Sequence, residues 1–305
     1  MGCFSGDDEP LYVILPYFNF CGFKSRRRLF IDFIERNKKL AGVRFVVSEI
    51  LGPAPLPNLP VWKHIKTGTK CQMWVKESII NMASTQLPKN WKYIAWIDAD
   101  ILFLNENWIQ DTKESLEYND IVQLFHTAVN MGPRGEAIKT DKSFGYMHSR
   151  SGTPYTSSDK YGFWHPGYAW ACTRSAWTKM GGLLDWAILG SADRHMALAW
   201  IGQVENSRPG NIHPNYIRLL LDFQAKCKKF RVGNVDGTIL HEWHGRLEDR
   251  KYRERWEILS RHQFDPLTDL SLTTSGLIQL TASGQRLQND LTSYFMERKE
   301  DSRGV

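Results

Sequence analysis

The stretch that decides the fold is Tyr93-Ile94-Ala95-Trp96-Ile97-Asp98-Ala99-Asp100-Ile101-Leu102-Phe103. Its apolar start predicts a buried strand over residues 93–98. Asp98 and Asp100 follow, with one small residue between them. In an extended chain, residues i and i+2 point to the same side, so we expect both carboxylates to face one point. That point would lie at the carboxyl end of a central strand, where open α/β sheets bind ligands.

The two carboxylates predict a metal site. Two like charges this close repel each other and require a cation or a proton. Oxygen ligands suit Mg²⁺ or Mn²⁺, which can bridge a carboxylate to a diphosphate. The alternative is a strand end with two solvated acids, because an Asp-x-Asp pattern also arises by chance. Its position after an apolar strand favours the metal.

A second candidate motif is Gly237-Thr238-Ile239-Leu240-His241-Glu242-Trp243-His244-Gly245. Imidazole is a good further ligand for Mn²⁺ or Zn²⁺. His241 and His244 share a face only if the chain is helical or turned there. A regular strand would separate them, so that one binds metal while the other touches phosphate. The alternative is two histidines packed beside Trp243.

The remaining pattern predicts an α/β fold, with a mostly parallel central sheet flanked by helices. Strands are expected at 11–15, 43–50, 93–98, 121–125 and, as a strand or turn, 239–243; helices are expected at 24–40, 74–82, 177–184, 192–201, 246–261 and 286–298. Residues 126–162 hold few large aliphatic side chains and predict a long loop near a site. We expect one domain over 1–265 and a C-terminal helical extension over 266–305.

Composition narrows the class of partner. The chain of 305 residues has a formal charge of +6, which favours an anionic ligand. Its basic residues are dispersed and form no long arm, so we expect no nucleic-acid partner. The five cysteines form no CxxC pair, which fits a reducing compartment. No apolar run reaches the roughly 18 residues of a membrane span, and the first residues lack the features of a secretory signal.

Together, the carboxylate pair and the later histidines resemble the GT-A (Rossmann-like) nucleotide-sugar transferases. A second likeness covers Gly167-Tyr168-Ala169-Trp170-Ala171-Cys172-Thr173-Arg174, then Gly181-Gly182, and Leu189-Gly190-Ser191-Ala192-Asp193. This run is similar to the acceptor side of the β1,4-galactosyltransferases and the polypeptide GalNAc-transferases. The chain departs from them in having Ser191-Ala192-Asp193 in place of a Glu-Asp run, and it lacks their WGWG string. The resemblance spans roughly residues 10–265.

The resemblance implies a metal-dependent transferase that moves a hexose or N-acetylhexosamine from a nucleotide-sugar, a UDP-sugar above all, to a hydroxyl of a saccharide or other acceptor. Mn²⁺ or Mg²⁺ would be the cofactor, His244 the main imidazole ligand and His241 its assistant. Asp193 falls where the galactosyltransferases carry their catalytic base. The implied donor-binding residues are Pro16, Tyr17, Arg26, Arg28, Glu49, Lys76 and Asp98. Candidates to line the sugar and acceptor subsites are Trp164, His165, Trp170 and Trp186, each with core packing as the alternative.

Two rival functions stay open on the sequence. One is a metal-dependent phosphoester hydrolase using the same acids and histidines, although two-metal sites usually need more ligands. The other is a non-catalytic carbohydrate- or nucleic-acid-binding protein, which the aromatic share of 12% and the basic charge would support. Animal Golgi glycosyltransferases carry a membrane anchor, and we see no such segment in this sequence. We therefore expect a cytoplasmic enzyme of bacterial or viral source, or a shortened form. The oligomeric state is left open.

Overall fold

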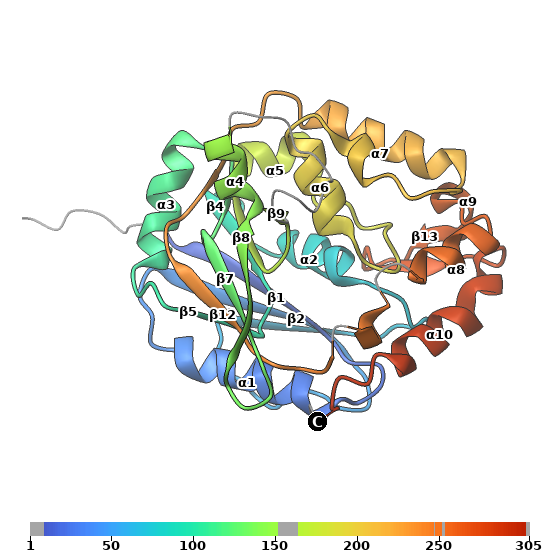
Figure 1. Cartoon of the computed structure of the whole chain (residues 1–305), viewed down its shortest axis with the longest axis horizontal. Helices are drawn as coiled ribbons and strands as arrows, with labels where there is room; N and C mark the ends of the chain where they lie inside the picture. Colours follow the sequence, from blue (N-terminus) through green and yellow to red (C-terminus); the bar gives the residue numbers. More distant parts are fainter. Residues whose placement is uncertain (1–8, 152–163, 247, 252–253, 303–305) are drawn as a thin grey trace, which may run out of the picture.

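A seven-stranded sheet has the order β11-β6-β10-β4-β1-β2-β3. Its strands β1, β2 and β4 lie at the centre of the protein (Figure 1). The computed structural model describes residues 9–151, 164–246, 248–251 and 254–302. The strands are Leu11–Phe18 (β1), Val43–Ile50 (β2), Lys63–Thr67 (β3), Tyr93–Ile97 (β4), Ile121–Gln123 (β6), Ala169–Thr173 (β10) and Val232–Asn234 (β11). β10 runs antiparallel to β4 and β6, and the other neighbours pair in parallel. The predicted mostly parallel α/β sheet is confirmed.

Alternate residues of β1 enter two different cores, as the period of a strand requires. Leu11, Val13 and Leu15 pack on the side of α1 and α3, whereas Tyr12 and Ile14 pack on the side of the other helices. The first face is covered by α1 (Lys24–Asn37) and α3 (Trp108–Tyr118); the second is covered by α2 (Lys76–Ser84), α5 (Arg174–Met180), α6 (Ala192–Trp200) and α7 (Pro214–Lys226). Helices therefore bury both faces of the sheet, as parallel sheets require.

A second, five-stranded sheet has the order β5-β12-β7-β8-β9. Its strands are Ile101–Phe103 (β5), Thr127–Met131 (β7), Ala137–Ser143 (β8), Trp164–His165 (β9) and Thr238–His241 (β12). β5 and β12 are antiparallel, with His241 opposite Ile101. The amide of Glu242 also donates to the carbonyl oxygen of Asp100 at 2.8 Å. This pairing brings His241 beside Asp100, although the two residues lie 141 positions apart along the chain.

Three predicted elements need correction. The loop expected over 126–162 is wrong for its first part, which forms β7, β8 and α4 (Phe144–Ser151), while residues 152–163 lie outside the described residues. β8 carried no apolar signal because most of its side chains are exposed. The helix expected over 246–261 is a 3₁₀ turn at Glu248–Arg250, and an α-helix, α8, begins only at Arg255 and ends at Arg261. The helix expected over 177–184 is α5, which ends at Met180 because Gly181 adopts a left-handed φ of 78°.

The C-terminal elements gather at one end of the molecule, at the right of Figure 1. They are α9 (Pro266–Asp269), β13 (Leu270–Leu272), β14 (Ile278–Leu280) and α10 (Gln288–Glu297). The predicted helix over 286–298 is confirmed, and a small hairpin precedes it. Ile278, Leu291 and Phe295 join the core that α2 helps to form, and the domain boundary at residue 265 stays a prediction. Within the described ranges, no helix has both the length and the apolar character that crossing a bilayer would need.

Candidate active site

A cleft of about 940 Å³ opens at the carboxyl ends of β1 and β4. β1 lies between β4 and β2 in the sheet. The chain therefore continues from β1 toward β2 on one side, and from β4 toward β6 on the other side. Open α/β sheets bind ligands at such a switch point. The predicted site residues that line this cleft are Pro16, Tyr17, Arg26, Lys76, Asp98, Asp100, His165, Asp193, His241 and His244. A volume of this size is at the upper end of small-molecule sites.

Asp100, His241 and His244 form a compact cluster in the cleft. One ligand atom from each lies within 4.8 Å of the other two, the spacing of a group that could hold a metal ion. His244 Nε2 is 3.0 Å from Asp100 Oδ2, and His241 Nε2 is 3.8 Å from the same oxygen. The two imidazole Nε2 atoms are 3.2 Å apart. The cluster forms because β12 ends at His241, after which the chain turns and returns His244 to the same point.

Asp100 has the electrostatics of a metal ligand. Burial on its own raises the pKa of a carboxyl, but the neighbouring His244, together with the electrostatic effects of His241 and Arg250, outweighs it and holds the pKa of Asp100 well below its usual range. The carboxylate is therefore ionised at neutral pH. Its Oδ1 is buried and has no hydrogen-bond partner among the described residues. A buried oxygen of this kind is normally satisfied, and a bound cation would satisfy it.

Asn130 fixes the tautomer of His241. The Nδ1–H of His241 donates to Asn130 Oδ1 at 2.9 Å, and the Tyr168 hydroxyl donates to the same oxygen at 2.8 Å. Asn130 Nδ2 in turn donates to Asp141 Oδ2 at 3.1 Å. Since Nδ1 carries the proton, the Nε2 lone pair of His241 points into the cluster. Burial also lowers the pKa of His241 well below its ordinary value, so the ring is neutral, as metal binding requires.

Arg250 brings a positive charge to the same point. Its Nη2 donates to His244 Nε2 at 3.0 Å, and the residue lines the cleft. A cation bound by His244 would take over the lone pair that Arg250 now uses. The guanidinium would then be available to an anionic group of the ligand beside the metal.

Asp98 has a different partner from Asp100. Its Oδ1 forms an ion pair with Lys76 Nζ. β4 ends at Ile97 and the chain turns at Ala99 and Asp100, so the expected extended chain is wrong there, although both carboxylates line the cleft. The carboxylates of Asp98, Glu77 and Asp193 outweigh the effect of burial and raise the pKa of Lys76, which stays charged. A ligand role for Asp98 stays a prediction.

Asp193 lies in the first turn of α6 and lines the cleft. Ser191 precedes it with a left-handed φ of 75°. A Cβ atom on Gly167 would lie 3.0 Å from Asp193 Oδ2, so the absence of a side chain at Gly167 leaves room for this carboxylate. Asp193 also acts electrostatically on Lys76 and Asp98. The predicted base and the Asp-x-Asp segment therefore belong to one site.

Five predicted site residues are not among the residues that line the cleft. Arg28 is exposed and paired with Asp32. Glu49 is fully buried, where it accepts from the amide of Leu56 at 2.8 Å and contacts His64 Nε2 at 2.7 Å. Trp164 and Trp170 are buried in the core, and Trp186 packs partly buried against it. For these residues, core packing or surface pairing is what the described structure shows.

The cleft also contains residues that the sequence did not single out as a site. Trp74, Glu77, Lys139, Asp141, Arg255, Trp256 and Arg298 line it, as does Asn130. Asn130 and Asp141 come from the β7–β8 hairpin. The apolar Ala128, Val129 and Met131 were the signal that could have revealed β7.

Glu77 gives a prediction for the pH dependence of stability. Burial raises the pKa of Glu77 to about 8, from an ordinary value of 4.5. The folded protein keeps a proton that the unfolded chain releases, so the free energy of unfolding falls as pH rises from about 4.5 through about 8, by at most ~1.4 kcal/mol per pH unit. Glu77→Gln cannot ionise. Its melting temperature should rise relative to that of wild type between about pH 5 and about pH 8, and a difference between the two melting temperatures that stays constant over this range would contradict this.

Fold and site together define an α/β protein with a side-chain cluster that could hold a metal ion, in a cleft at the carboxyl edge of its sheet. Neither a protein-family model nor a curated protein sequence matches the chain. Solved structures do. The catalytic domain of Drosophila β1,4-galactosyltransferase 7 in complex with xylobiose is 12% identical, with a TM-score of 0.41, over 92% of this chain and 97% of that chain. The mannosyltransferase PcManGT from Pyrobaculum calidifontis, in complex with GDP-Man and Mn²⁺, is 14% identical, with a TM-score of 0.46, over 84% of this chain and 62% of that chain.

A third similar structure is glucosyl-3-phosphoglycerate synthase from Mycobacterium tuberculosis in complex with Mn²⁺, uridine diphosphate and glucosyl-3-phosphoglycerate. It is 12% identical, with a TM-score of 0.36, over 85% of this chain and 78% of that chain.

Proposed function

We propose that this chain is a metal-dependent glycosyltransferase of the GT-A type, which moves a sugar from a nucleotide-sugar to a hydroxyl of a saccharide or other acceptor. One observation carries the proposal: a half-buried, ionised Asp100 whose buried Oδ1 has no hydrogen-bond partner among the described residues, with two imidazole Nε2 atoms beside it in a large cleft. One carboxylate and two imidazoles make a donor set for a first-row divalent cation, and they favour Mn²⁺ over the harder Mg²⁺.

The chain's own residues would hold the donor. Asp100, His241 and His244 would bind the cation, with Asp98 as a further candidate. When bound, the metal supplies neutralisation of the charge that develops on the leaving diphosphate. Lys76, Arg250 and Arg298 line the same cleft and provide positive charge for phosphate oxygens. Pro16 and Tyr17, at the end of β1, are the candidates to contact the nucleoside, most simply that of a UDP-sugar.

Asp193 is the proposed catalytic base. Its carboxylate would take the proton of the acceptor hydroxyl as that oxygen attacks the sugar, which would give inversion of configuration. His165 lines the cleft nearby and stacks on Tyr168, with ring centroids 4.1 Å apart. Burial lowers the pKa of His165 to about 4, so the ring is neutral and can act as a hydrogen-bonding group toward a sugar.

Thermal shift tests this proposal against its rivals. UDP-sugars with Mn²⁺ should raise the melting temperature of wild type by several degrees at saturation, because a ligand that binds only the folded state stabilises it. The same mixture should leave Asp100→Ala unchanged. Release of UDP from the nucleotide-sugar should accompany binding. Cleavage of a simple phosphomonoester without nucleotide-sugar turnover would favour the hydrolase, and binding that only nucleic acid produces, with steep salt dependence, would favour the binding protein.

A further inference from the structure

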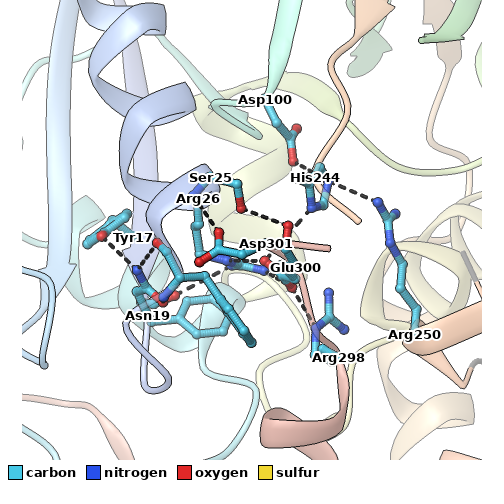
Figure 2. A network of polar contacts seen from close by, with 12 residues as sticks. Tyr17, Asn19, Ser25, Arg26, Asp100, His244, Arg250, Arg298, Glu300 and Asp301 are labelled. Carbon is cyan, nitrogen blue, oxygen red and sulfur yellow. Dashed lines mark hydrogen bonds and ion pairs between the residues drawn. The ribbon is translucent and has the colours of Figure 1, made fainter. Parts of the chain in front are cut away.

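The C-terminal strap, which we define as residues 298–302, crosses from α10 to the start of α1 and to the loop that carries His244. Asp301 accepts hydrogen bonds from the backbone amides of Lys24 at 2.9 Å and Ser25 at 2.7 Å. Ser25 Oγ donates to the carbonyl oxygen of Glu300 at 2.9 Å. The indole of Trp243 donates to the carbonyl oxygen of Ser302 at 3.3 Å. Figure 2 shows this strap between the first helix and His244.

Glu300 lies at the centre of the strap, buried to 2% exposure. Arg26 donates two hydrogen bonds to the Glu300 carboxylate, from Nε at 2.7 Å and from Nη2 at 2.6 Å. Arg298 Nε donates a third at 2.7 Å. The third neighbouring group is His244, whose Nδ1 is 3.8 Å from Glu300 Oε2. One buried carboxylate therefore faces two guanidinium groups and the ring of the candidate metal ligand (Figure 2).

The ring of His244 is thereby held between two carboxylates. Nδ1 faces Glu300, while Nε2 faces Asp100 at 3.0 Å. Histidines that bind metals commonly turn their second nitrogen to a carboxylate, which fixes the ring and increases its basicity. Asn130 plays the corresponding part for His241. Each imidazole of the cluster thus has its own group on the outer nitrogen, one from β7 and one from the C-terminal strap.

The backbone beside His244 is built for a close approach of the strap. Gly245 has a φ of 94°, a region that side chains rarely adopt. A Cβ atom there would lie 2.9 Å from Glu300 Cα and 3.1 Å from the carbonyl oxygen of Lys299. Arg298 also stacks over Trp74, 5.4 Å from the ring centroid, and both residues line the cleft. The strap therefore meets the site along its length and not through one side chain alone.

From this geometry we infer that Glu300 is a positioning residue for the metal site. It orients His244 for the cation, and it holds Arg26 and Arg298 at the cleft wall, where they can meet a diphosphate. This inference rests on the proposed function. The contacts of Asp301 and Ser302 would be enough if the strap served only to hold residues 298–302 against the protein. That purely structural role would not need a buried carboxylate beside Nδ1 of His244.

Mn²⁺ affinity, measured on the full chain without nucleotide by titration calorimetry, tests the inference. Glu300→Gln should bind Mn²⁺ about 10- to 100-fold more weakly than wild type. The matched control is Asp301→Asn in the same strap, which should lower the melting temperature while Mn²⁺ affinity stays within about twofold. Wild-type affinity in Glu300→Gln would overturn the inference and leave the proposed function intact, whereas a wild type that binds no Mn²⁺ would remove the proposed function itself.

A double-variant comparison separates positioning from simple destabilisation. If Glu300 acts through His244, Glu300→Gln should change Mn²⁺ affinity little in a His244→Ala background. Equal losses in both backgrounds would overturn the inference. Should Glu300→Gln not fold, Glu300→Asp makes the same test, because it keeps the charge for both arginines but withdraws the carboxylate from Nδ1. Its Mn²⁺ affinity should fall as well, and unchanged affinity would count against the positioning role.

Discussion

Replacing Asp100 by asparagine is expected to weaken Mn²⁺ binding by about a hundredfold or more. Even the loss of a residue that only hydrogen-bonds to a metal ligand lowers metal affinity by about 10- to 100-fold. The amide keeps the size of the side chain but removes the charge that balances two imidazoles and Arg250. Turnover of a nucleotide-sugar should fall by about 10³, the scale seen when one source of charge stabilisation is removed from a transition state. Calorimetric titration with Mn²⁺ and release of UDP measure the two effects.

The control for this experiment is Asp222→Asn, an exposed carboxylate on α7 outside the cleft. It makes the same chemical change and should leave both Mn²⁺ affinity and turnover at the level of wild type. Circular dichroism checks that both variants fold. Mn²⁺ affinity within about threefold of wild type in Asp100→Asn would show that the cation binds elsewhere.

Asp193→Asn is expected to lower the rate of sugar transfer by about 10² to 10⁴, the usual contribution of a general base. The affinity for the donor with Mn²⁺ should stay within a few-fold, because Asp193 belongs to α6 and not to the ligand cluster. The measurement is kcat at saturating donor against a panel of saccharide acceptors, with donor affinity from calorimetry. This split between kcat and binding distinguishes a base from a residue that holds the donor.

Glu205→Gln is the matched control for Asp193→Asn. Glu205 is exposed, one short turn beyond α6, and does not line the cleft. Its transfer rate should equal that of wild type. A normal transfer rate in Asp193→Asn, or a loss of donor binding as large as the loss of rate, would assign the base to another residue.

The elements that the sequence predicted well are those with large apolar side chains at regular spacing. β1, β2, β4 and α1 bury their apolar residues in the two cores, so short apolar runs identified the strands and helical spacing identified α1. The β7–β8 hairpin was missed because β8 is mostly exposed, and an exposed strand has no apolar pattern to detect. Asn130 was missed together with the hairpin, because its contact with His241 exists only when β7 lies beside β12.

The histidine pair shows the limit of spacing arguments. Spacing could say only that a turn would bring His241 and His244 together and that a strand would separate them. The outcome depends on where β12 ends, and that is set by its pairing with β5, a contact between residues far apart in sequence. The same holds for Glu300, because nothing near it in the chain indicates that it will meet His244.

Residue type alone also failed to separate binding side chains from core side chains. Trp164 and Trp170 were candidates for a sugar subsite and lie buried in the core. Trp74 and Trp256, which were not candidates, line the cleft. Glu49 lies near the end of its strand as predicted, but its carboxylate contacts Leu56 and His64 inside the protein. Tryptophan and strand-end acids serve both purposes, so only the three-dimensional arrangement separates them.

The central claim is that Asp100, His241 and His244 bind one divalent cation. Crystals of the full chain grown with Mn²⁺ and measured at the manganese absorption edge test it directly. We expect one anomalous peak in the cleft, bonded to an oxygen of Asp100 and to Nε2 of both histidines, with Arg250 displaced from His244. A cleft without such a peak, or a peak bonded to none of these three side chains, would contradict the claim.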